Sequence, residues 1–383
     1  MKRGIFVFLM ALFFSILNAS NIEAKELVTD SQSAIVIEQS TGTILYDKNM
    51  HDKLAPASMT KIMTMLLIME EIDQGRLKLE DLVRTSEYAA SMGGSQIFLE
   101  EGEQMTVEDM LTAISIASAN DASVAMAEKI AGSEEDFVKK MNHRVKELGL
   151  KNTKFQNSTG LPVKDHYSTA YDMAIIAKEL LRYEEITDFT KQYEAYLRED
   201  TDKKFWLVNT NKLVKFYPGV DGLKTGFTRD AMYCLTATAK KDDMRVITVV
   251  FGASTSKIRN AEITKLLDYA FSQFETKKLY EANEIFATPI VSKGKKKTVD
   301  LVSKEPVSLL IKKGEKIGEI KTELIINEKT KAPIKKGDEL GKLVIKKKDE
   351  EVLSVPLVSK ESVNKANWWE LYKRAFSQFT QTY

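Results

Sequence analysis

The chain has few of the side chains that most often carry metal or redox chemistry. Its 383 residues include one cysteine, Cys234, and three histidines, His51, His143 and His166. A single cysteine excludes an intramolecular disulfide and a cysteine-rich zinc site. The histidines are far apart and form no HExxH pattern, which argues against a histidine-ligated metal. We therefore expect neither a metal nor a cofactor.

Net charge is also nearly absent. Lysine and arginine total 56 against 55 acidic residues, so the chain lacks the basic excess of typical nucleic-acid binders, and we expect no nucleic-acid partner. The balance nevertheless hides an uneven distribution, because residues 25–276 sum to −8 and residues 277–360 to +7. The second segment is basic enough to suit a position beside an anionic membrane or cell wall.

The apolar run near the N-terminus is too short to cross a bilayer. It extends from Ile5 to Leu17, thirteen residues, whereas a spanning helix needs about 20. Lys2 and Arg3 precede it and small residues follow, which is typical of a secretory signal peptide at residues 1–24, cleaved after Ala24. An uncleaved N-terminal anchor is the alternative. Both interpretations predict an exported protein, either at the outer face of the cytoplasmic membrane or secreted.

Residues 25–276 show strand patterns at both ends and helical patterns between them. A hairpin is predicted over 34–46 and another over 232–251, and a buried helix begins at Pro56. Further helical segments are predicted to start at residues 106, 133 and 169, the first ending near Gly132, and a last helix at 258–274. We expect an α/β (α+β) domain whose antiparallel sheet joins the first and last strands.

The remaining chain divides into two segments. Residues 277–360 contain short β-rich runs separated by Lys-Gly turns, which predicts a small all-β sandwich domain. Residues 361–383 have an aromatic stripe at helical spacing that includes Trp368, Trp369 and Tyr372. Such an amphipathic helix is typical of segments that bind a membrane surface, and packing of the stripe against the β-domain is the alternative.

Three short motifs occur in order along the predicted catalytic domain: Ser58-Met-Thr-Lys61, Ser118-Ala-Asn120 and Lys224-Thr-Gly226. On a helix, Lys61 lies one turn beyond Ser58 on the same face, within reach of its hydroxyl. A serine needs a base to act as a nucleophile, and no histidine is placed for that role. A lysine kept neutral by burial and by a second cation, which Lys224 supplies, is the natural candidate.

The other motif residues suit the rest of an acyl transfer. Ser118 offers a hydroxyl to relay a proton, and Asn120 offers an amide to orient Lys61 or the substrate. Gly226 lets a substrate backbone lie close to its strand. In a purely structural interpretation, Lys61 is an ordinary helix lysine, Ser118 and Asn120 form a helix kink, and Lys224-Thr-Gly226 is a turn. That interpretation does not explain why an otherwise apolar helix carries one serine and one lysine on the same face.

With these motifs, the sequence resembles the low-molecular-mass penicillin-binding proteins, which are serine-type D-alanyl-D-alanine carboxypeptidases. The resemblance extends over essentially the whole chain. It includes Ser91-Met-Gly-Gly-Ser-Gln96, Asn157-Ser-Thr-Gly-Leu161, Asp165-His-Tyr-Ser168, Asn209-Thr-Asn-Lys212 and the segment Tyr217 to Gly226. It implies a penicillin-binding/serine β-lactamase-like catalytic domain, a peptidoglycan pentapeptide as substrate and β-lactam antibiotics as covalent inhibitors.

The resemblance also implies a role for each site residue. Ser58 is the acylated nucleophile, Lys61 its base, and Ser118 and Asn120 the second-motif pair. Lys224 with Thr225, in the Lys-Thr-Gly226 motif, binds the terminal carboxylate of the substrate, and backbone N–H groups of Ser58 and Phe227 form the oxyanion hole. His166 matches a family residue for which we expect a structural role. Met232 stands where many relatives have glycine, so the shape of that turn is left open.

Three other functions use the same features. A class A β-lactamase shares the three motifs, but the extra β-domain and the lack of an obvious deacylating glutamate argue against it. An endopeptidase that cuts cross-links would use the same residues. A catalytically idle wall-binding scaffold is the alternative from another class, and the complete motifs argue against it.

Overall fold

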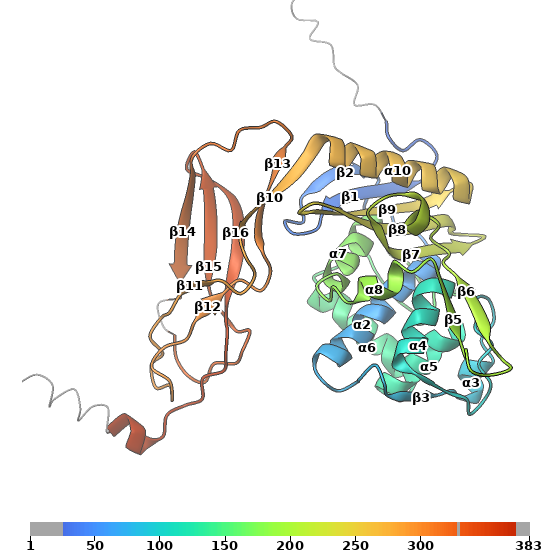
Figure 1. Ribbon diagram of the computed structural model, residues 1–383, viewed down its shortest axis with the longest axis horizontal. Helices are drawn as coiled ribbons and strands as arrows, with labels where there is room; N and C mark the ends of the chain where they lie inside the picture. The colour runs from blue at the N-terminus through green and yellow to red at the C-terminus, as the bar shows by residue number, and fades with distance from the viewer. Residues whose placement is uncertain (1–25, 328–329, 373–383) are drawn as a thin grey trace, which may run out of the picture.

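The central sheet of the catalytic domain is built from both ends of that domain. The computed structural model describes residues 26–327 and 330–372, so the predicted signal peptide lies outside them (Figure 1). Five antiparallel strands follow the order β2-β1-β9-β8-β7. They are β1 (Ser33–Glu38), β2 (Ile44–Lys48), β7 (Val220–Thr228), β8 (Met232–Lys241) and β9 (Met244–Ala253). The predicted pairing of the first and last strands is confirmed, because β1 lies beside β9.

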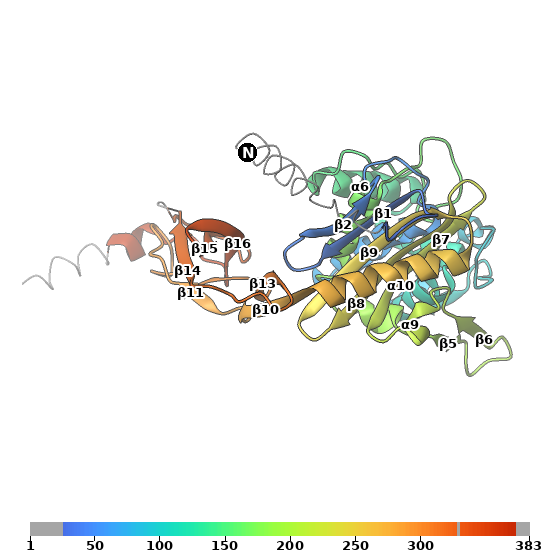
Figure 2. The ribbon, with the colours of Figure 1, turned by 90° about the horizontal axis from the view of Figure 1, so that it is seen from above.

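Helices cover both faces of this sheet. Helix α10 (Ser256–Gln273) lies on one face and leads into the second domain, as Figure 2 shows. On the other face lie α2 (Lys61–Asp73), α4 (Val107–Thr112), α5 (Asn120–Ala131), α6 (Glu134–Glu147) and α7 (Ala170–Leu180), with the short helices α3 (Glu87–Ala90) and α8 (Ile186–Thr190). The short helix α9 (Leu213–Phe216) shares the core of α10 instead, through Leu213. Strand β1 is accordingly buried on both faces: Ile35 and Ile37 join the core with α2, and Ala34 and Val36 join the core with α10.

The predicted helix starts at Thr106, Ser133 and Thr169 are confirmed, because each hydroxyl accepts the backbone N–H of the residue three positions later. The expectation that the first of these segments continues to Gly132 is wrong. Helix α4 passes into the π-helical turn η2 (Ala113–Ala117) and ends at Ser118, whose φ of 64° is left-handed. Helix α5 then starts anew at Asn120, so the second motif occupies the break between two helices.

Two small hairpins border the helical cluster and were not predicted. Strands β3 (Leu82–Arg84) and β4 (Gln104–Thr106) form one, and β5 (Glu194–Leu197) and β6 (Phe205–Val208) form the other. Each strand has three or four residues, too few for a period-2 pattern to stand out from the sequence.

The second domain is the predicted all-β sandwich. Strand β10 (Phe274–Tyr280) follows α10 directly and pairs with β13 (Val307–Lys312). The second sheet has the order β11-β12-β16-β15-β14, from β11 (Ile285–Ala287), β12 (Leu301–Val302), β14 (Ile320–Ile326), β15 (Glu339–Lys347) and β16 (Glu350–Ser359). Both sheets contribute to one apolar core that includes Val307, Leu343 and Leu357. Among the described residues, no helix is long and apolar enough to cross a membrane.

Candidate active site

Ser58 and Lys61 lie at the junction of two helical turns. Ser58 belongs to the 3₁₀ turn η1 (Ala57–Thr60), and Lys61 is the first residue of α2. The lysine side chain is fully buried, whereas Ser58 is half-buried and so accessible to a substrate. The Lys61 Nζ lies 3.3 Å from Ser58 Oγ. The i, i+3 spacing therefore places the two groups in contact, as the sequence predicts.

The remaining partners of Lys61 leave one position on its nitrogen for the Ser58 hydroxyl. Its Nζ donates to Asn120 Oδ1 at 2.7 Å and to the backbone carbonyl of Thr159 at 2.7 Å. Both oxygens only accept. A neutral amine has two N–H donors and one lone pair, so with both donors used the lone pair is left for the Ser58 hydroxyl. Burial, and secondarily the positive charge of Lys224, hold the pKa of Lys61 well below 10.5, which favours this neutral form.

The second motif is held by a neighbouring loop. The Asn120 amide nitrogen donates to the Gly93 carbonyl at 2.7 Å, and the Asn120 backbone N–H donates to the Ser95 carbonyl at 2.7 Å. The Gly93 carbonyl can only accept a hydrogen bond, so the nitrogen of the Asn120 amide faces Gly93 and its oxygen faces Lys61. The Ser118 hydroxyl is buried and has no hydrogen-bond partner within the described residues. Its hydrogen-bonding capacity is therefore unused by the described residues.

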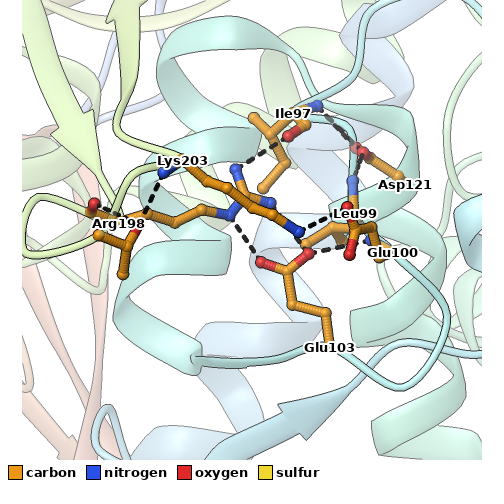
Figure 3. Close-up of polar contacts among 8 residues, drawn as sticks. Ile97, Leu99, Glu100, Glu103, Asp121, Arg198 and Lys203 are labelled. Atoms are coloured by element: carbon orange, nitrogen blue, oxygen red, sulfur yellow. Dashed lines mark hydrogen bonds and ion pairs between the residues drawn. The ribbon is translucent and has the colours of Figure 1, made fainter.

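Figure 3 shows the polar contacts that hold the loop before this motif. The Asp121 carboxylate accepts the backbone N–H groups of Ile97, at 3.0 Å, and Leu99, at 3.1 Å. Arg198, just after β5, donates to Glu103 at 2.6 and 3.1 Å and to the Ile97 carbonyl at 3.1 Å. Because Asp121 follows Asn120, these contacts connect the β5–β6 hairpin to the second motif.

The third motif brings buried positive charge to the site. Burial, followed by the charge of Arg259 on α10, lowers the pKa of Lys224 to about 7. Burial likewise lowers the pKa of Arg259 to about 10. Within the described residues, Lys61, Lys224 and Arg259 donate only to neutral oxygens. Lys224 and Arg259 are thus two buried cationic groups without a carboxylate partner, which favours an anionic ligand.

Gly226 lies against the turn that carries Ser58. A Cβ at this position would lie 2.7 Å from the Pro56 carbonyl oxygen and 3.2 Å from the Ala57 Cβ. The glycine therefore lets β7 pack against the turn η1, and its expected close approach to a substrate backbone stays a prediction. Strand β7 is the edge of the sheet, and the Phe227 side chain beside Gly226 is exposed. The Thr225 hydroxyl donates to Thr210 Oγ1 at 2.8 Å.

His166 supports the turn η1, which carries Ser58. Its Nδ1 accepts the Gln156 backbone N–H at 3.2 Å, so the ring proton is on Nε2, which lies 2.8 Å from Thr60 Oγ1. Burial lowers the pKa of His166 to about 4, so the ring is neutral at pH 7. These contacts agree with the structural role expected from the sequence.

Sequence comparisons identify the family. The profile described as D-alanyl-D-alanine carboxypeptidase matches residues 20–255, and that described as the C-terminal domain of penicillin-binding protein 5 matches residues 274–365. The chain belongs to the D-alanyl-D-alanine carboxypeptidase family. The family member DacF of Bacillus subtilis is 61% identical over 93% of this chain and 92% of DacF. The D-alanyl-D-alanine carboxypeptidase DacC of Escherichia coli is 38% identical over 75% of this chain and 72% of DacC.

Solved structures agree with this carboxypeptidase family assignment. Penicillin-binding protein 5 of Haemophilus influenzae superposes with a TM-score of 0.69 at 33% identity, covering 88% of this chain and 98% of that one. Penicillin-binding protein D2 of Listeria monocytogenes, in an ampicillin-bound form, has a TM-score of 0.55 at 31% identity, covering 63% and 97%. The fold expected from the resemblance is thus confirmed.

Sequence reasoning missed several groups around the motifs of this carboxypeptidase family member. Thr159 lies in the segment Asn157 to Leu161, which carried the resemblance without an assigned role, and its carbonyl is the second acceptor for Lys61. The Gly93 carbonyl belongs to another such segment. Arg259 sits in the first turn of α10 and had no local signal, because only the folded sheet brings it near Lys224.

Proposed function

We propose that this carboxypeptidase removes the terminal D-alanine from peptidoglycan pentapeptides through an acyl-enzyme on Ser58. The observation that carries the proposal is the environment of Lys61. Its two N–H donors are used by Asn120 Oδ1 and the Thr159 carbonyl, and burial favours the neutral amine. Its lone pair is then available to take the proton of the Ser58 hydroxyl, 3.3 Å away.

A carboxypeptidase must recognise a free terminal carboxylate, and the third motif suits that task. Lys224 and Arg259 supply positive charge without a protein carboxylate in the described part of the chain, and Thr225 lies beside them on β7. Binding an anion there raises the pKa of Lys224 from about 7 toward its usual range, because the charged ammonium gains a partner. The substrate carboxylate thus stabilises the protonated form of the lysine that holds it.

The reaction then follows from the positions of these groups. Ser58 Oγ attacks the carbonyl of the penultimate D-alanine as its proton moves to Lys61 Nζ, and the backbone N–H groups of Ser58 and Phe227 stabilise the oxyanion. The C–N bond breaks when the leaving amine receives a proton from Lys61 through the Ser118 hydroxyl. Asn120 keeps Lys61 oriented. A water molecule, with Lys61 again as base, hydrolyses the ester and releases the shortened peptide.

The same chemistry makes β-lactams covalent inhibitors. A β-lactam carries an amide carbonyl and a carboxylate that match the nucleophile and the cationic end of the site, so Ser58 opens the ring and stays acylated. The ampicillin-bound form of the Listeria neighbour supports this proposal.

The decisive experiment incubates the mature protein with penicillin and, separately, with a pentapeptide. It measures the mass of the protein, the turnover of penicillin and the release of D-alanine. We expect a stable mass adduct on Ser58 and D-alanine release that disappears in Ser58→Ala. Rapid penicillin turnover without an adduct indicates a β-lactamase, and release from cross-linked dimers but not from pentapeptide indicates an endopeptidase. Neither adduct nor turnover of any substrate indicates an idle scaffold. Each of these three results contradicts the proposal.

Export and membrane-surface binding are part of the same proposal. Residues 1–24, with their charged start and short apolar run, support a cleaved signal peptide and action outside the cytoplasm. In the tail, residues 368–372 are helical, and Trp368 and Trp369 are 70% and 62% exposed, which supports a surface-binding helix over packing against the β-domain. Residues 373–383 lie outside the described part. Deleting residues 364–383 should abolish vesicle binding and leave peptide hydrolysis intact; unfolding would support packing instead.

A further inference from the structure

Within the described residues, one ion pair joins the catalytic domain to the β-domain. The Arg182 Nε, at the end of α7, lies 3.1 Å from Glu305 Oε1, which belongs to the loop between β12 and β13. The Arg182 Nη1 also lies 3.0 Å from Glu179 Oε1, so one guanidinium serves two carboxylates. The side chains of Arg182 and Glu305 are 37% and 39% exposed, and an ion pair so accessible to water stabilises the domain junction only weakly.

A pocket of about 360 Å³ lies beside this ion pair. The end of α7 forms one wall, and the turn between β1 and β2, with Ser40 and Thr41, forms a second. The β-domain supplies the other walls, from residues 304–308 and from residues 353–356 of β16. Figure 1 shows α7 on the catalytic side of this junction and β16 on the other. Both domains therefore build the pocket.

Two lysines that line the pocket have no carboxylate partner. Lys178, one helical turn before Arg182, forms no ion pair within residues 26–327 and 330–372, and neither does Lys304. A Cβ at Gly42 would lie 3.1 Å from the Lys178 Nζ, so this glycine leaves room for the ammonium against the β1–β2 turn. Lys304 is exposed on the facing loop of the β-domain. With Arg182, the two lysines bring three cations to one pocket.

The two carboxylates that line the pocket are both held by arginines. Glu179 accepts hydrogen bonds from Arg144 at 2.6 Å and from Arg182 at 3.0 Å, whereas Glu305 pairs only with Arg182 in the described part of the chain. Glu305 is therefore the member that a competing anion can replace. A phosphate suits the exchange, because a guanidinium binds two of its oxygens at once and its remaining oxygens accept from lysines on other sides.

The pocket is remote from Ser58. Strands β1, β9, β8 and β7 pair in that order, and this pairing places Glu38, just before the β1–β2 turn, at the end of the sheet where β7 begins with Val220. Gly226, which contacts the turn η1, is six residues further along β7, or about 20 Å. A ligand in the pocket thus leaves the reaction at Ser58 unobstructed.

We propose that this pocket binds a phosphate group of a soluble phosphodiester chain, which takes the place of Glu305 on Arg182. Lys178 and Lys304 hold the same phosphate from the two domains. Pro356 of β16 offers apolar surface to the carbon spacer beside the phosphate. A free chain enters a recess between two domains, whereas a flat bilayer surface does not, so we assign the pocket to a soluble polymer and not to a lipid headgroup. The site tethers the enzyme to an anionic polymer.

The test titrates the full mature protein with inorganic tripolyphosphate in a calorimeter. We expect one site per chain, with an affinity that falls as the salt concentration rises, because the contacts are ionic. An exposed ion pair accounts for about a three- to fivefold effect, so Lys178→Gln, Lys304→Gln and Arg182→Gln should each weaken binding by about that factor. Glu305→Gln should instead strengthen binding by about the same factor, because no carboxylate then competes with the phosphate for Arg182.

The opposite signs at Arg182 and Glu305 distinguish a ligand site from a structural link. If the ion pair only held the domains together, both substitutions would loosen the same junction and change the affinity in the same direction. Lys360→Gln removes the charge of an exposed β-domain lysine that does not line the pocket, so it should leave the affinity unchanged. The same sign in both variants, an equal loss in Lys360→Gln, or no binding to wild type overturns the assignment.

A second titration identifies the source of the phosphate. A synthetic oligo(glycerol phosphate) should bind the variants in the same order as tripolyphosphate does, whereas binding to phosphatidylglycerol vesicles should be equal in wild type and in all pocket variants. Variants that change vesicle binding but not oligomer binding assign the pocket to a lipid headgroup and contradict the proposal. Acylation by benzylpenicillin should persist in every variant, because the pocket is remote from Ser58, and it shows that a changed affinity is not a loss of folding.

Discussion

Substituting Gly160 by alanine should disturb the active site through backbone contact alone. Gly160 has a φ of +84°, and a Cβ there would lie 1.8 Å from the Ala57 carbonyl oxygen, 2.3 Å from its carbonyl carbon and 2.9 Å from Thr60 Oγ1. Two of these atoms are backbone, so rotation of a side chain cannot relieve the contact. The loop that carries Thr159 must instead move away from the turn η1.

The expected loss in the free energy of unfolding has two contributions. A left-handed conformation costs alanine about 1–2 kcal/mol, and forcing an extra carbon into a packed interface costs about 1–3 kcal/mol more. The free energy of unfolding should therefore fall by about 2–5 kcal/mol. The shift also lengthens the 2.7 Å contact between Lys61 Nζ and the Thr159 carbonyl. Misplacement by about 1 Å near reacting groups can lower a rate about 100-fold, so we expect acylation to slow by that order.

A matched variant isolates the steric part. Gly132 has nearly the same φ, +83°, but a Cβ there meets nothing within 4 Å. Gly132→Ala should therefore lose only about 1–2 kcal/mol and keep its acylation rate. Thermal unfolding, at about 2–4 °C per kcal/mol for a domain of this size, and acylation by fluorescent penicillin measure both effects. Equal melting temperatures for the two variants, with wild-type acylation in Gly160→Ala, would refute the reasoning.

Three further predictions address charge. Lys224→Gln removes the cation that adds to burial in lowering the pKa of Lys61, so the acid limb of the acylation pH profile should move to higher pH; an unmoved limb contradicts the coupling. Arg198→Ala should lower the free energy of unfolding by about 1–3 kcal/mol, because it leaves the partly buried Glu103 carboxylate without its partner. The exposed Lys203→Ala should lower it by less than about 0.5 kcal/mol in the same denaturant titration. In the folded protein, burial lowers the pKa of His166 to about 4, whereas in the unfolded chain the ring takes up a proton near pH 6.5. The free energy of unfolding should therefore fall as the pH drops from about 6.5 to about 4. The loss should reach about 2 kcal/mol at pH 5, and His166→Gln should flatten that slope in pH-dependent unfolding.

Prediction from sequence succeeded where neighbours along the chain decide the structure. The starts of α4, α6 and α7 were predictable because a serine or threonine hydroxyl accepts the backbone N–H three residues later in the chain. The long strands β8 and β9 followed from an alternating pattern around a polar turn. The short strands of the β3–β4 and β5–β6 hairpins did not, because their pairing depends on the surfaces on which they lie.

The break at Ser118 shows the same limit within the active site. The residues from Thr106 to Gly132 are compatible with one helix, since alanine, isoleucine and serine all occur in helices. The turn instead ends in a left-handed serine, and the Asn120 N–H bonds to the Ser95 carbonyl. The local sequence pattern around Ser118 cannot predict this contact with the Ser95 loop.

The scarcity of histidine and cysteine, together with three ordered motifs, was enough to predict a serine nucleophile and a lysine base. Those inferences depend on residue type and on spacing within one helical turn, which the sequence states directly. Tertiary structure alone decided which groups accept hydrogen bonds from the lysine and why Gly226 is small. The Thr159 carbonyl is 98 residues from Lys61, and Arg259 reaches Lys224 only across the folded sheet. Desolvation and the supply of acceptors are properties of a side chain's surroundings, and those surroundings exist only once the chain has folded.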